Sequence, residues 1–364
     1  MEKTAKIYVA GHHGLVGSAI WNNLQKKGYT NLVGCSHKEL DLLDGVAVKT
    51  FFDREQPEYV ILAAAHVGGI MANSLYRADF IYQNLQIQQN VIGESFRHGV
   101  KKLLFLGSTC IYPRDAEQPM KENALLTSPL EYTNEPYAIA KIAGLKMCES
   151  FNLQYGTNYI AVMPTNLYGP NDNFHLENSH VLPAMIRKIH LAKCLNESDW
   201  GAIRKDLSLR PVEGVDATAS EGKILSVLHK YGITGPSVVL WGTGKPLREF
   251  LWSEEMADAS VYIMEHVNFE DTYQKGTKDV RNCHINIGTG KEITIATLAD
   301  LIVKETKYQG KVIFDSTKPD GTMRKLTDVS KLHALGWHHR IDIEEGVHKL
   351  SLIHISEPTR HAQI

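Results

Sequence analysis

Three glycines spaced GxxGxxG constrain the fold of this chain more than any other feature of its sequence. Gly11, Gly14 and Gly17 stand between an apolar, β-branched run at residues 6–10 and a stretch with helical spacing at residues 18–27. Glycines at a strand-to-helix turn let the backbone approach a pyrophosphate at the helix N-terminus, where free N–H groups and the helix dipole favour anions. The pattern is weakly specific alone, but its place at the first strand-to-helix junction predicts a dinucleotide-binding turn.

Strand-like and helix-like segments continue to alternate after this turn. Further strand candidates lie at residues 31–34, 59–64, 102–106 and 159–164, each separated from the next by enough chain for a helix. Such alternation is typical of right-handed βαβ units. The sequence therefore predicts an α/β protein with a doubly wound, Rossmann-type parallel sheet.

The alternation breaks down after Pro170. Residues 171–178 are predicted to be a polar loop and residues 181–192 a helix. Residues 196–235 are polar and punctuated by glycine, with one short helical stretch near residues 224–229. This region has the character of an insertion in a second, substrate-facing lobe.

Two later segments, residues 249–266 and 283–288, again resemble strand, helix and strand, which predicts that the chain returns to the first sheet. At a typical 100–200 residues per domain, the length suggests about two domains. We therefore expect a smaller α/β substrate-binding lobe beside the Rossmann-type domain. The predicted boundaries are 1–171, 248–267 and 283–290 for the dinucleotide-binding domain, and 172–247, 268–282 and 291–349 for the lobe.

The charge balance excludes two classes of partner. Lys and Arg number 39 against 41 Asp and Glu, so no excess of positive charge is available for nucleic acid or an anionic membrane surface. No apolar run approaches the roughly 20 residues that span a bilayer, and no hydrophobic leader follows Met1, so we expect a cytoplasmic protein. The five cysteines form no CxxC pair, which argues for reduced thiols and against a metal site.

The segment about 20 residues after the glycines indicates which dinucleotide fits. An acidic residue there would hold the ribose hydroxyls of NAD, but the sequence reads Gly34-Cys35-Ser36-His37-Lys38 and has no carboxylate before Glu39. A hydroxyl, an imidazole and an ammonium suit a ribose 2′-phosphate better, so NADP(H) is favoured as cofactor. The alternative, that Lys38 is only a solvated loop charge, stays open.

A YxxxK motif supplies a candidate acid–base pair. Tyr137 and Lys141 are one helical turn apart, so the ammonium is expected beside the phenol, where it would lower the phenol's pKa from about 10. Upstream, Ser108 follows the fourth predicted strand, at the edge of a parallel sheet where ligands bind. Together with the glycine turn, these residues predict hydride transfer between a carbonyl and an alcohol, with Tyr137 exchanging the proton and Ser108 binding the reacting oxygen.

Two further residues have the chemistry to move protons on carbon. Cys110 lies two residues beyond Ser108, and His180 directly precedes the predicted helix at 181–192. A thiol and an imidazole can remove and supply protons at carbons next to a ketone. The pattern alone favours plainer roles, a small buried hydrophobic residue for Cys110 and a helix cap for His180.

At these residues the chain resembles the GDP-L-fucose synthases, a family of extended short-chain dehydrogenases/reductases. The resemblance runs from about residue 6 to residue 349 and is carried by specific stretches. They are Val67-Gly68-Gly69-Ile70, Asp79-Phe80-Ile81-Tyr82-Gln83-Asn84, Leu106-Gly107-Ser108-Thr109-Cys110-Ile111-Tyr112-Pro113, Asn134-Glu135-Pro136-Tyr137-Ala138-Ile139-Ala140-Lys141, Met163-Pro164-Thr165-Asn166-Leu167-Tyr168-Gly169-Pro170 and Lys318-Pro319-Asp320-Gly321-Thr322.

The resemblance implies conversion of GDP-4-keto-6-deoxy-D-mannose to GDP-L-fucose. Cys110 and His180 would carry the 3,5-epimerisation, after which Ser108, Tyr137 and Lys141 would reduce C4 with NADPH. The implied NADP(H) contacts are Gly11, His12, His13, Gly14, Leu15, Val16, Gly17, His37, Lys38, Glu39, Leu40, Asp41, Leu42, Leu106, Gly107, Ser108, Thr109, Lys141, Pro164, Thr165, Asn166, Leu167 and His180.

The resemblance also implies the partners of the chain. Lys188, Trp241, Arg248 and Asp320 would contact the GDP-sugar, with Lys188 and Arg248 as counter-charges for the diphosphate and Trp241 as an apolar wall. A homodimer is expected through the helices that follow Asp79 and Tyr137.

The chain departs from the family pattern near the expected 2′-phosphate site. His13 and Cys35 stand where arginine is common, and His66 replaces a usual lysine. Because an imidazole is a weaker phosphate partner than a permanent guanidinium, we expect the NADP affinity to be reduced and dependent on pH. Trp252-Ser253-Glu254-Glu255 and Met323 also differ from the pattern.

Three alternatives stay open at this point. The chain could be another nucleotide-sugar 4-epimerase or 4-reductase, for which Cys110 and His180 would be dispensable, or a non-catalytic NADP-binding protein. The last fifteen residues, 350–364, resemble the translation of a sequencing adaptor and are expected to be non-native. A native C-terminal strand and tail is the alternative for this segment.

Overall fold

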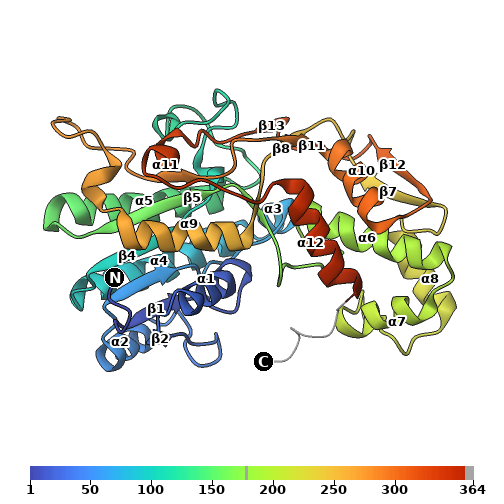
Figure 1. The fold of residues 1–364 in the computed structure, drawn as a ribbon, viewed down its shortest axis with the longest axis horizontal. Coiled ribbons are helices and arrows are strands. Elements are labelled where there is room, and N and C mark those ends of the chain that lie inside the picture. The colour runs from blue at the N-terminus through green and yellow to red at the C-terminus, as the bar shows by residue number, and fades with distance from the viewer. Residues whose placement is uncertain (177–178, 357–364) are drawn as a thin grey trace. The chain divides into compact units, whose positions relative to one another are not determined.

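The computed structural model describes residues 1–176 and 179–356, and within them the chain forms two compact units (Figure 1). Both units are assembled from separate stretches of sequence. The first contains residues 1–167, 249–291 and 326–340, and the second contains residues 168–248, 292–325 and, within the described chain, 341–356. The predicted boundaries differ at residues 268–282 and 326–340, which lie in the first unit.

A six-stranded sheet forms the centre of the first unit, as predicted. The strands lie in the order β2, β1, β3, β4, β5, β10, and every neighbouring pair is parallel. The pairing of β10 with β5 confirms that the chain returns to the first sheet. The strands are β1 (Ile7–Ala10), β2 (Leu32–Val33), β3 (Tyr59–Leu62), β4 (Lys102–Leu106), β5 (Tyr159–Pro164) and β10 (Ile285–Ile287).

Helices cover both faces of this sheet. Successive side chains of a strand point to opposite faces, so each strand contacts helices on both sides. Ile7 and Val9 of β1 are buried with side chains of α1 and α9, whereas Tyr8 and Ala10 are buried with side chains of α2, α4 and α5. The strands are therefore apolar on both sides, which is typical of a doubly wound fold. The covering helices are α1 (Leu15–Lys26), α2 (Gly45–Glu55), α4 (Arg77–Arg97), α5 (Glu135–Tyr155) and α9 (Ser253–His266). Shorter helices are α3 (Ile70–Leu75), η1 (Thr109–Ile111), η2 (Glu122–Ala124), η3 (Phe269–Thr272) and α11 (Ser330–Ala334).

A buried lysine fixes α9 against the sheet. The ammonium of Lys102, at the start of β4, donates to the carbonyls of Ile263 (2.8 Å), Met264 (2.9 Å) and Val267 at the C-terminal end of α9. These carbonyls lie where a helix leaves acceptors without intrahelical partners, and the helix dipole favours a cation there. Burial lowers the pKa of Lys102 to about 8.

The segment that begins at residue 249 differs in part from the prediction. Its strand β9 (Phe250–Trp252) pairs with β6 (Asn166–Tyr168) in a separate two-stranded sheet, and only β10 joins the central sheet. Glu249, fully buried beside β9, accepts hydrogen bonds from the backbone N–H groups of Thr289, Gly290 and Thr327 at 2.7–2.9 Å. One carboxylate thus joins two of the three chain segments of the first unit, residues 249–291 and 326–340.

The second unit is a smaller α/β lobe, as predicted. Its strands form a parallel pair, β7 with β12, and a three-stranded sheet in the order β11, β8, β13. The strands are β7 (Ser237–Trp241), β8 (Leu247–Arg248), β11 (Ile293–Thr294), β12 (Lys311–Asp315) and β13 (Arg324–Lys325). The helices are α6 (Val181–Asn196), α7 (Trp200–Leu209), α8 (Glu221–Lys230), α10 (Ile295–Thr306) and α12 (Ile343–Ser356).

The insertion at residues 196–235 contains two helices, so the prediction of one helical stretch was wrong. The missed helix, α7, is held to α6 by the fully buried guanidinium of Arg187, which donates to both carboxylate oxygens of Asp206 at 2.8–3.3 Å. A third donor of Arg187 reaches the carbonyl of Phe174 at 3.1 Å. The helix depends on this tertiary pair, which local sequence patterns do not report.

The C-terminal helix α12 continues past residue 350, into the segment predicted to be non-native. Val347 and Leu350 are buried in it, at 0% and 1% exposure. The non-native origin of residues 350–364 stays a prediction, and residues 357–364 lie outside the described part, as do residues 177–178 of the predicted loop. Among the helices that the structure describes, none combines the length and apolar character needed to cross a membrane.

Candidate active site

The glycine turn forms a close backbone crossing between β1 and α1. A Cβ atom on Gly11, which has φ +84°, would lie 2.8 Å from the backbone nitrogen of Ala64, and one on Gly17 would lie 2.0 Å from the carbonyl oxygen of Gly11. Gly14 is the N-cap residue of α1 and brings no side chain over the helix end. The N–H groups of the first turn, at Leu15 to Gly17, are the donors that a pyrophosphate would use.

The two histidines of this turn stack on each other. The ring centroids of His12 and His13 are 3.8 Å apart, and the His12 ring also lies 5.2 Å from that of Trp21. His12 Nδ1 is buried and has no hydrogen-bond partner among the described residues. Burial, together with the charge of His13, lowers the pKa of His12, so its ring is a neutral group with an unused ring nitrogen. The turn, with its open helix end, fits a dinucleotide.

The segment predicted to distinguish NADP from NAD is exposed and carries mixed charge. The carboxylate of Glu39 accepts from the backbone N–H and the hydroxyl of Ser36, at 2.7 and 2.8 Å, and these bonds lower the pKa of Glu39. His37 lies 3.7 Å from Asp41 in an exposed pair, and Lys38 is exposed. Leu40 is buried and Leu42 half-buried, so these two side chains support the segment from beneath.

The ends of β4 and β5 supply the other predicted cofactor contacts. Gly107 is pressed against β5, since a Cβ atom there would lie 2.3 Å from the sulfur of Met163. After Pro164, the backbone N–H of Thr165 donates to Ile287, and the amide of Asn166 donates to the carbonyl of Glu249 at 2.8 Å. Leu106, Thr109 and Leu167 lie at the same ends of these strands.

Tyr137 and Lys141 occupy the first turns of α5, as the motif predicts. Pro136 stands at the start of the helix, where its missing N–H leaves no hydrogen bond unmade. The Lys141 ammonium lies 5.7 Å from the centre of the Tyr137 ring and donates to the carbonyl of Leu106 at 2.9 Å. The structure therefore places the pair beside the end of β4.

The expected lowering of the Tyr137 pKa is wrong for this arrangement. Burial raises the pKa of Tyr137, and the nearby Cys110 adds to the effect. The ammonium that was expected to oppose this shift is directed at the Leu106 carbonyl, and burial lowers its own pKa to about 8. A buried phenol with a raised pKa keeps its proton, as suits an acid that gives a proton to a developing alkoxide.

Ser108 and Cys110 lie together on the turn η1. The hydroxyl oxygen of Ser108 accepts from the backbone N–H of Cys110 at 3.3 Å, which leaves its O–H available as a donor. Cys110 is buried, with 6% exposure, and is close enough to Tyr137 and Lys141 that a thiolate there would raise the pKa of both. Four of the five predicted catalytic residues thus meet in the first unit.

The fifth, His180, lies in the second unit as the N-cap residue of α6. Its side chain makes no capping hydrogen bond, so the plainer role as a helix cap is not what its geometry provides. The ring is solvent-accessible, but the surrounding protein atoms lower the pKa of its imidazole by desolvation. A neutral imidazole of this kind can accept a proton.

The predicted GDP-sugar contacts also lie in the second unit, where Lys188 is buried and Trp241 is exposed. Lys188 donates to the carbonyls of Tyr231 (2.8 Å) and Val239 (3.2 Å), and burial lowers its pKa to about 8. Trp241 is 57% exposed at the end of β7, which leaves its ring available to a ligand. Two predicted contacts of the GDP-sugar thus lie on neighbouring elements, α6 and β7.

Arg248 and Asp320 contact each other through the main chain. Arg248 donates to the carbonyls of Leu247 (2.8 Å) and Asp320 (3.5 Å). The carboxylate of Asp320 accepts from the backbone N–H of Thr243 (2.6 Å) and from its hydroxyl (2.8 Å), and these bonds lower the Asp320 pKa. Thr243 is a residue that was not predicted, since nothing in its local sequence pattern shows that it orients this carboxylate.

A second missed residue is Asn84, although it stands in a stretch that carries the family resemblance. Its side chain accepts from the backbone N–H of His66 at 3.0 Å and donates to the carbonyl of His66 at 2.9 Å. The His66 ring lies against Phe80, whose ring faces Tyr137 at 6.2 Å. Asn84 therefore fixes the loop after β3 near Tyr137, the tyrosine predicted to be catalytic.

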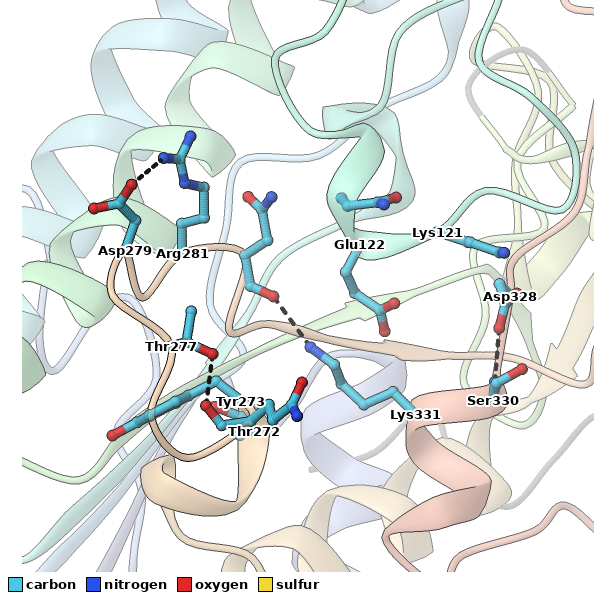
Figure 2. A pocket seen from close by; sticks show the side chains of 13 residues that line it. Lys121, Glu122, Thr272, Tyr273, Thr277, Asp279, Arg281, Asp328, Ser330 and Lys331 are labelled. Atoms are coloured by element: carbon cyan, nitrogen blue, oxygen red, sulfur yellow. Dashed lines mark hydrogen bonds and ion pairs between the residues drawn. The ribbon is translucent and has the colours of Figure 1, made fainter.

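A pocket of about 650 Å³ lies in the first unit but contains none of the predicted site residues (Figure 2). It is lined by η2, the loop at residues 272–282 and the start of α11. Charged groups of both signs point into it, Lys121, Arg281 and Lys331 against Glu122, Asp279 and Asp328. The residues predicted from the sequence to carry the chemistry therefore lie outside this pocket.

Comparison with known proteins identifies the family of the chain. Residues 7–209 and 207–288 match the model of the NAD dependent epimerase/dehydratase family. The chain is 50% identical to GDP-L-fucose synthase 1 of Arabidopsis thaliana over 346 residues, which cover 95% of this chain and 92% of that protein.

Two solved structures from Campylobacter jejuni are also similar. One is a GDP-6-OMe-4-keto-L-xylo-heptose reductase, at 43% identity and a TM-score of 0.92, with 98% of this chain and 99% of that one covered. The other is a GDP-D-glycero-L-gluco-heptose synthase in the presence of NADPH, at 43% identity and a TM-score of 0.89, with 96% and 98% covered. The chain belongs to the NAD dependent epimerase/dehydratase family, in the branch of extended short-chain dehydrogenases that includes the GDP-L-fucose synthases.

Proposed function

We propose that the protein converts GDP-4-keto-6-deoxy-D-mannose to GDP-L-fucose, by epimerisation at C3 and C5 followed by reduction at C4. The observation that carries the proposal is the grouping of Ser108, Cys110, Tyr137 and Lys141 at the end of β4. A plain reductase needs the hydroxyl, the phenol and the ammonium, but not a buried thiol among them. The half-identical plant relative bears the name of this activity.

The cofactor site is assigned to NADP(H). The residues of the glycine turn would hold its pyrophosphate, and Ser36, His37 and Lys38 would face its 2′-phosphate. When bound, NADPH supplies the hydride that reduces C4. The solved relative that contains NADPH supports this assignment.

The epimerisation uses the acidity of the protons beside the 4-keto group. Cys110 and His180 are assigned to remove one of these protons on one face of the sugar and to return one on the other, at C3 and at C5 in turn. Ser108 and Tyr137 donate hydrogen bonds to the C4 oxygen, where negative charge develops as the proton leaves. Electrostatic stabilisation at that oxygen is what makes a carbon acid react at useful rates.

The reduction reuses the same oxygen contacts. As C4 becomes an alkoxide, the protonated Tyr137 gives it a proton, and Lys141 stabilises the phenolate that forms. The raised pKa of Tyr137 and the buried, cationic Lys141 suit these roles. Lys188 and Arg248 are assigned to the diphosphate, and Trp241 to an apolar face of the ligand.

A second candidate is a GDP-sugar 4-reductase without epimerase activity, which the similarity to the heptose reductase favours. Incubation with GDP-4-keto-6-deoxy-D-mannose and NADPH in deuterated water separates the two. We expect deuterium at C3 and C5 of a fucose-configured product, and a Cys110→Ser variant should reduce the substrate with protium retained at these carbons. A wild-type product without deuterium would overturn the epimerase assignment.

The protein is further proposed to act as a cytoplasmic homodimer through α4 and α5. Large apolar side chains on these helices are exposed within the chain, with Tyr82 at 67%, Leu153 at 53% and Ile139 at 40%. Ile139 and Leu153 lie about four helical turns apart on one face of α5. Exposed apolar side chains gathered on a pair of helices are typical of a subunit contact.

A further inference from the structure

The turn that carries Ser108 and Cys110 is too short to hold itself in place. The turn η1 has three residues, and its own hydrogen bonds are the long ones from Ile111 to Ser108 (3.3 Å) and from Tyr112 to Thr109 (3.4 Å). A single 3₁₀ turn has poor hydrogen-bond geometry and little stability without outside contacts. Its position must therefore come from the residues at its ends.

Tyr112, directly after the turn, provides such a contact. Its side chain is 2% exposed, and its hydroxyl lies 2.5 Å from Asn286 Oδ1 and 2.9 Å from His284 Nε2. Asn286 Oδ1 can only accept, so the Tyr112 hydroxyl donates to it and accepts from Nε2–H of His284. Burial together with Lys331 and Lys146 keeps the pKa of His284 well below its ordinary value, so the donor is the neutral tautomer that carries its proton on Nε2.

Asn286 is fixed in turn by every polar group of its side chain. Its amide nitrogen donates to the carbonyls of Met120 (3.0 Å) and Asp328 (3.1 Å), and its backbone N–H donates to the Glu122 carboxylate (3.1 Å). It also pairs with β5 as a member of β10. The partner of Tyr112 is thus part of the rigid sheet and not of a mobile loop.

The outer end of this network lies at the pocket of Figure 2. The ammonium of Lys331 donates to the carbonyls of His284 (2.9 Å) and Asn282 (3.1 Å), and Lys331 and Glu122 line the same pocket (Figure 2). The two partners of Tyr112 are therefore held by charged groups, Glu122 for Asn286 and Lys331 for His284, as well as by the sheet. A satisfied, buried polar network of this kind specifies one arrangement of the groups that it joins.

We propose that Tyr112 is a positioning residue, whose hydroxyl, anchored to Asn286 of β10 and to His284 just before that strand, sets Cys110 at the angle that proton transfer to and from carbon requires. The proposal rests on the proposed function for its kinetic consequence. Ser108 is joined to the end of β4, whereas Cys110 lies two residues nearer to the anchor, so losing the anchor disturbs the thiol more than the reductase residues.

The test is Tyr112→Phe, which removes one buried hydroxyl and keeps the ring. Tyr159→Phe is the matched control. Tyr159 is 1% exposed in the sheet that contains Asn286, and its hydroxyl has no partner among the described residues. A misplacement of about 1 Å can cost on the order of 100-fold in rate, so we expect epimerisation to slow roughly 10- to 100-fold in Tyr112→Phe. Reduction at C4 should slow less than threefold or so, because Ser108, Tyr137 and Lys141 keep their anchors.

The readout is the product formed with NADPH in deuterated water. In Tyr112→Phe, we expect a larger share of reduced sugar that retains protium at C3 and C5, and in Tyr159→Phe the wild-type share. A general loss of structure would lower the total product without changing this share. An unchanged share in a folded Tyr112→Phe protein would overturn the proposal.

A second measurement does not depend on the proposed function. The rate at which iodoacetamide alkylates Cys110, read from the Cys110 peptide by mass spectrometry, reports how often the turn opens. We expect alkylation to be several-fold faster in Tyr112→Phe, intermediate in His284→Phe, and unchanged in Tyr159→Phe. If the wild-type protein adds no deuterium to its product, the proposed function fails, but the alkylation rate of Cys110 still tests the positioning role of Tyr112. Equal alkylation rates in all four proteins would refute that role.

Discussion

At the scale of single residues, the protonation of Lys141 connects the site to pH. Its folded-state pKa of about 8 lies below the ordinary 10.5, so Lys141 loses its proton earlier in the folded chain than in the unfolded one. Since the ammonium stabilises the phenolate of Tyr137, the reduction rate at saturating GDP-sugar should fall as pH rises through about 8. The GDP-sugar is kept saturating because the pKa of Lys188 is also lowered to about 8. Lys188 is assigned to substrate binding, so its titration should not change the rate at saturation.

Stability should change in the opposite direction. Between about 8 and 10.5 the unfolded chain binds more protons at Lys141, so this group makes the free energy of unfolding rise with pH. Rates measured by NADPH absorbance across this interval test the first expectation. A Lys141→Arg variant keeps its charge, and a decline that persists in this variant would assign the titration to another group.

Lys38 tests the choice of cofactor. It is an exposed cation in the segment after β2. The carboxylate of the neighbouring Glu39 accepts hydrogen bonds from Ser36. We expect Lys38→Ala to weaken NADPH binding about fivefold and to leave NADH binding unchanged, because only NADPH carries the 2′-phosphate. Fluorescence titration with both cofactors measures this, and Lys49→Ala, an exposed lysine on α2, is the control. Equal weakening for both cofactors would show that Lys38 contacts another part of the dinucleotide.

The site residues differ in how far a sequence can predict them. Tyr137 and Lys141 were predictable because their relation is set by one turn of one helix. The direction in which Lys141 points was not, because the Leu106 carbonyl that receives it belongs to a strand far away in the sequence. The same holds for Lys188 and for Thr243, whose partners come from other elements.

At the scale of elements, α7 is the helix that most depends on a single contact. Its Asp206 neutralises the fully buried Arg187 of α6, so Asp206→Asn would leave an unpaired buried charge. Breaking such a pair typically costs about 3–5 kcal/mol, which we expect as a loss in the free energy of unfolding, measured with urea. Glu213→Gln, in the exposed pair with Lys230, should leave stability unchanged. A similar small effect for both variants would mean that α7 is held mainly by its apolar face.

The elements were predictable where periodicity alone defines them. The five strands from β1 to β5 and the helix α5 follow from apolar runs and helical spacing, and each was found where expected. Helix α7 was missed because the stretch from residue 196 is polar and contains glycine. The residue that stabilises this helix, Arg187, lies outside the stretch. The strand β9 was assigned to the wrong sheet because a short buried run does not specify which edge it will join.

At the scale of the whole molecule, the proposed dimer makes a prediction about assembly. Leu153→Arg on α5 places a charge on an exposed apolar face, and burying an unpaired charge in a subunit contact is costly. We expect this variant to sediment as a monomer at concentrations where the parent chain is a dimer. Val46→Arg, at a residue of α2 that is 76% exposed, is the control and should remain dimeric. A Leu153→Arg protein that stays dimeric would place the contact elsewhere.

The discontinuous first unit has a consequence for synthesis on the ribosome. The five strands β2, β1, β3, β4 and β5 are complete once residue 164 has emerged, but the carbonyls that receive Lys102, at residues 263–267, and β10, at residues 285–287, are made much later. Until then, the nascent chain carries an unpaired β5 edge and a lysine without its acceptors, and the segment for the second unit must be accommodated in between. Contacts of such high sequence separation fold slowly. Production of this protein should therefore respond to translation speed and to chaperones that protect exposed strand edges.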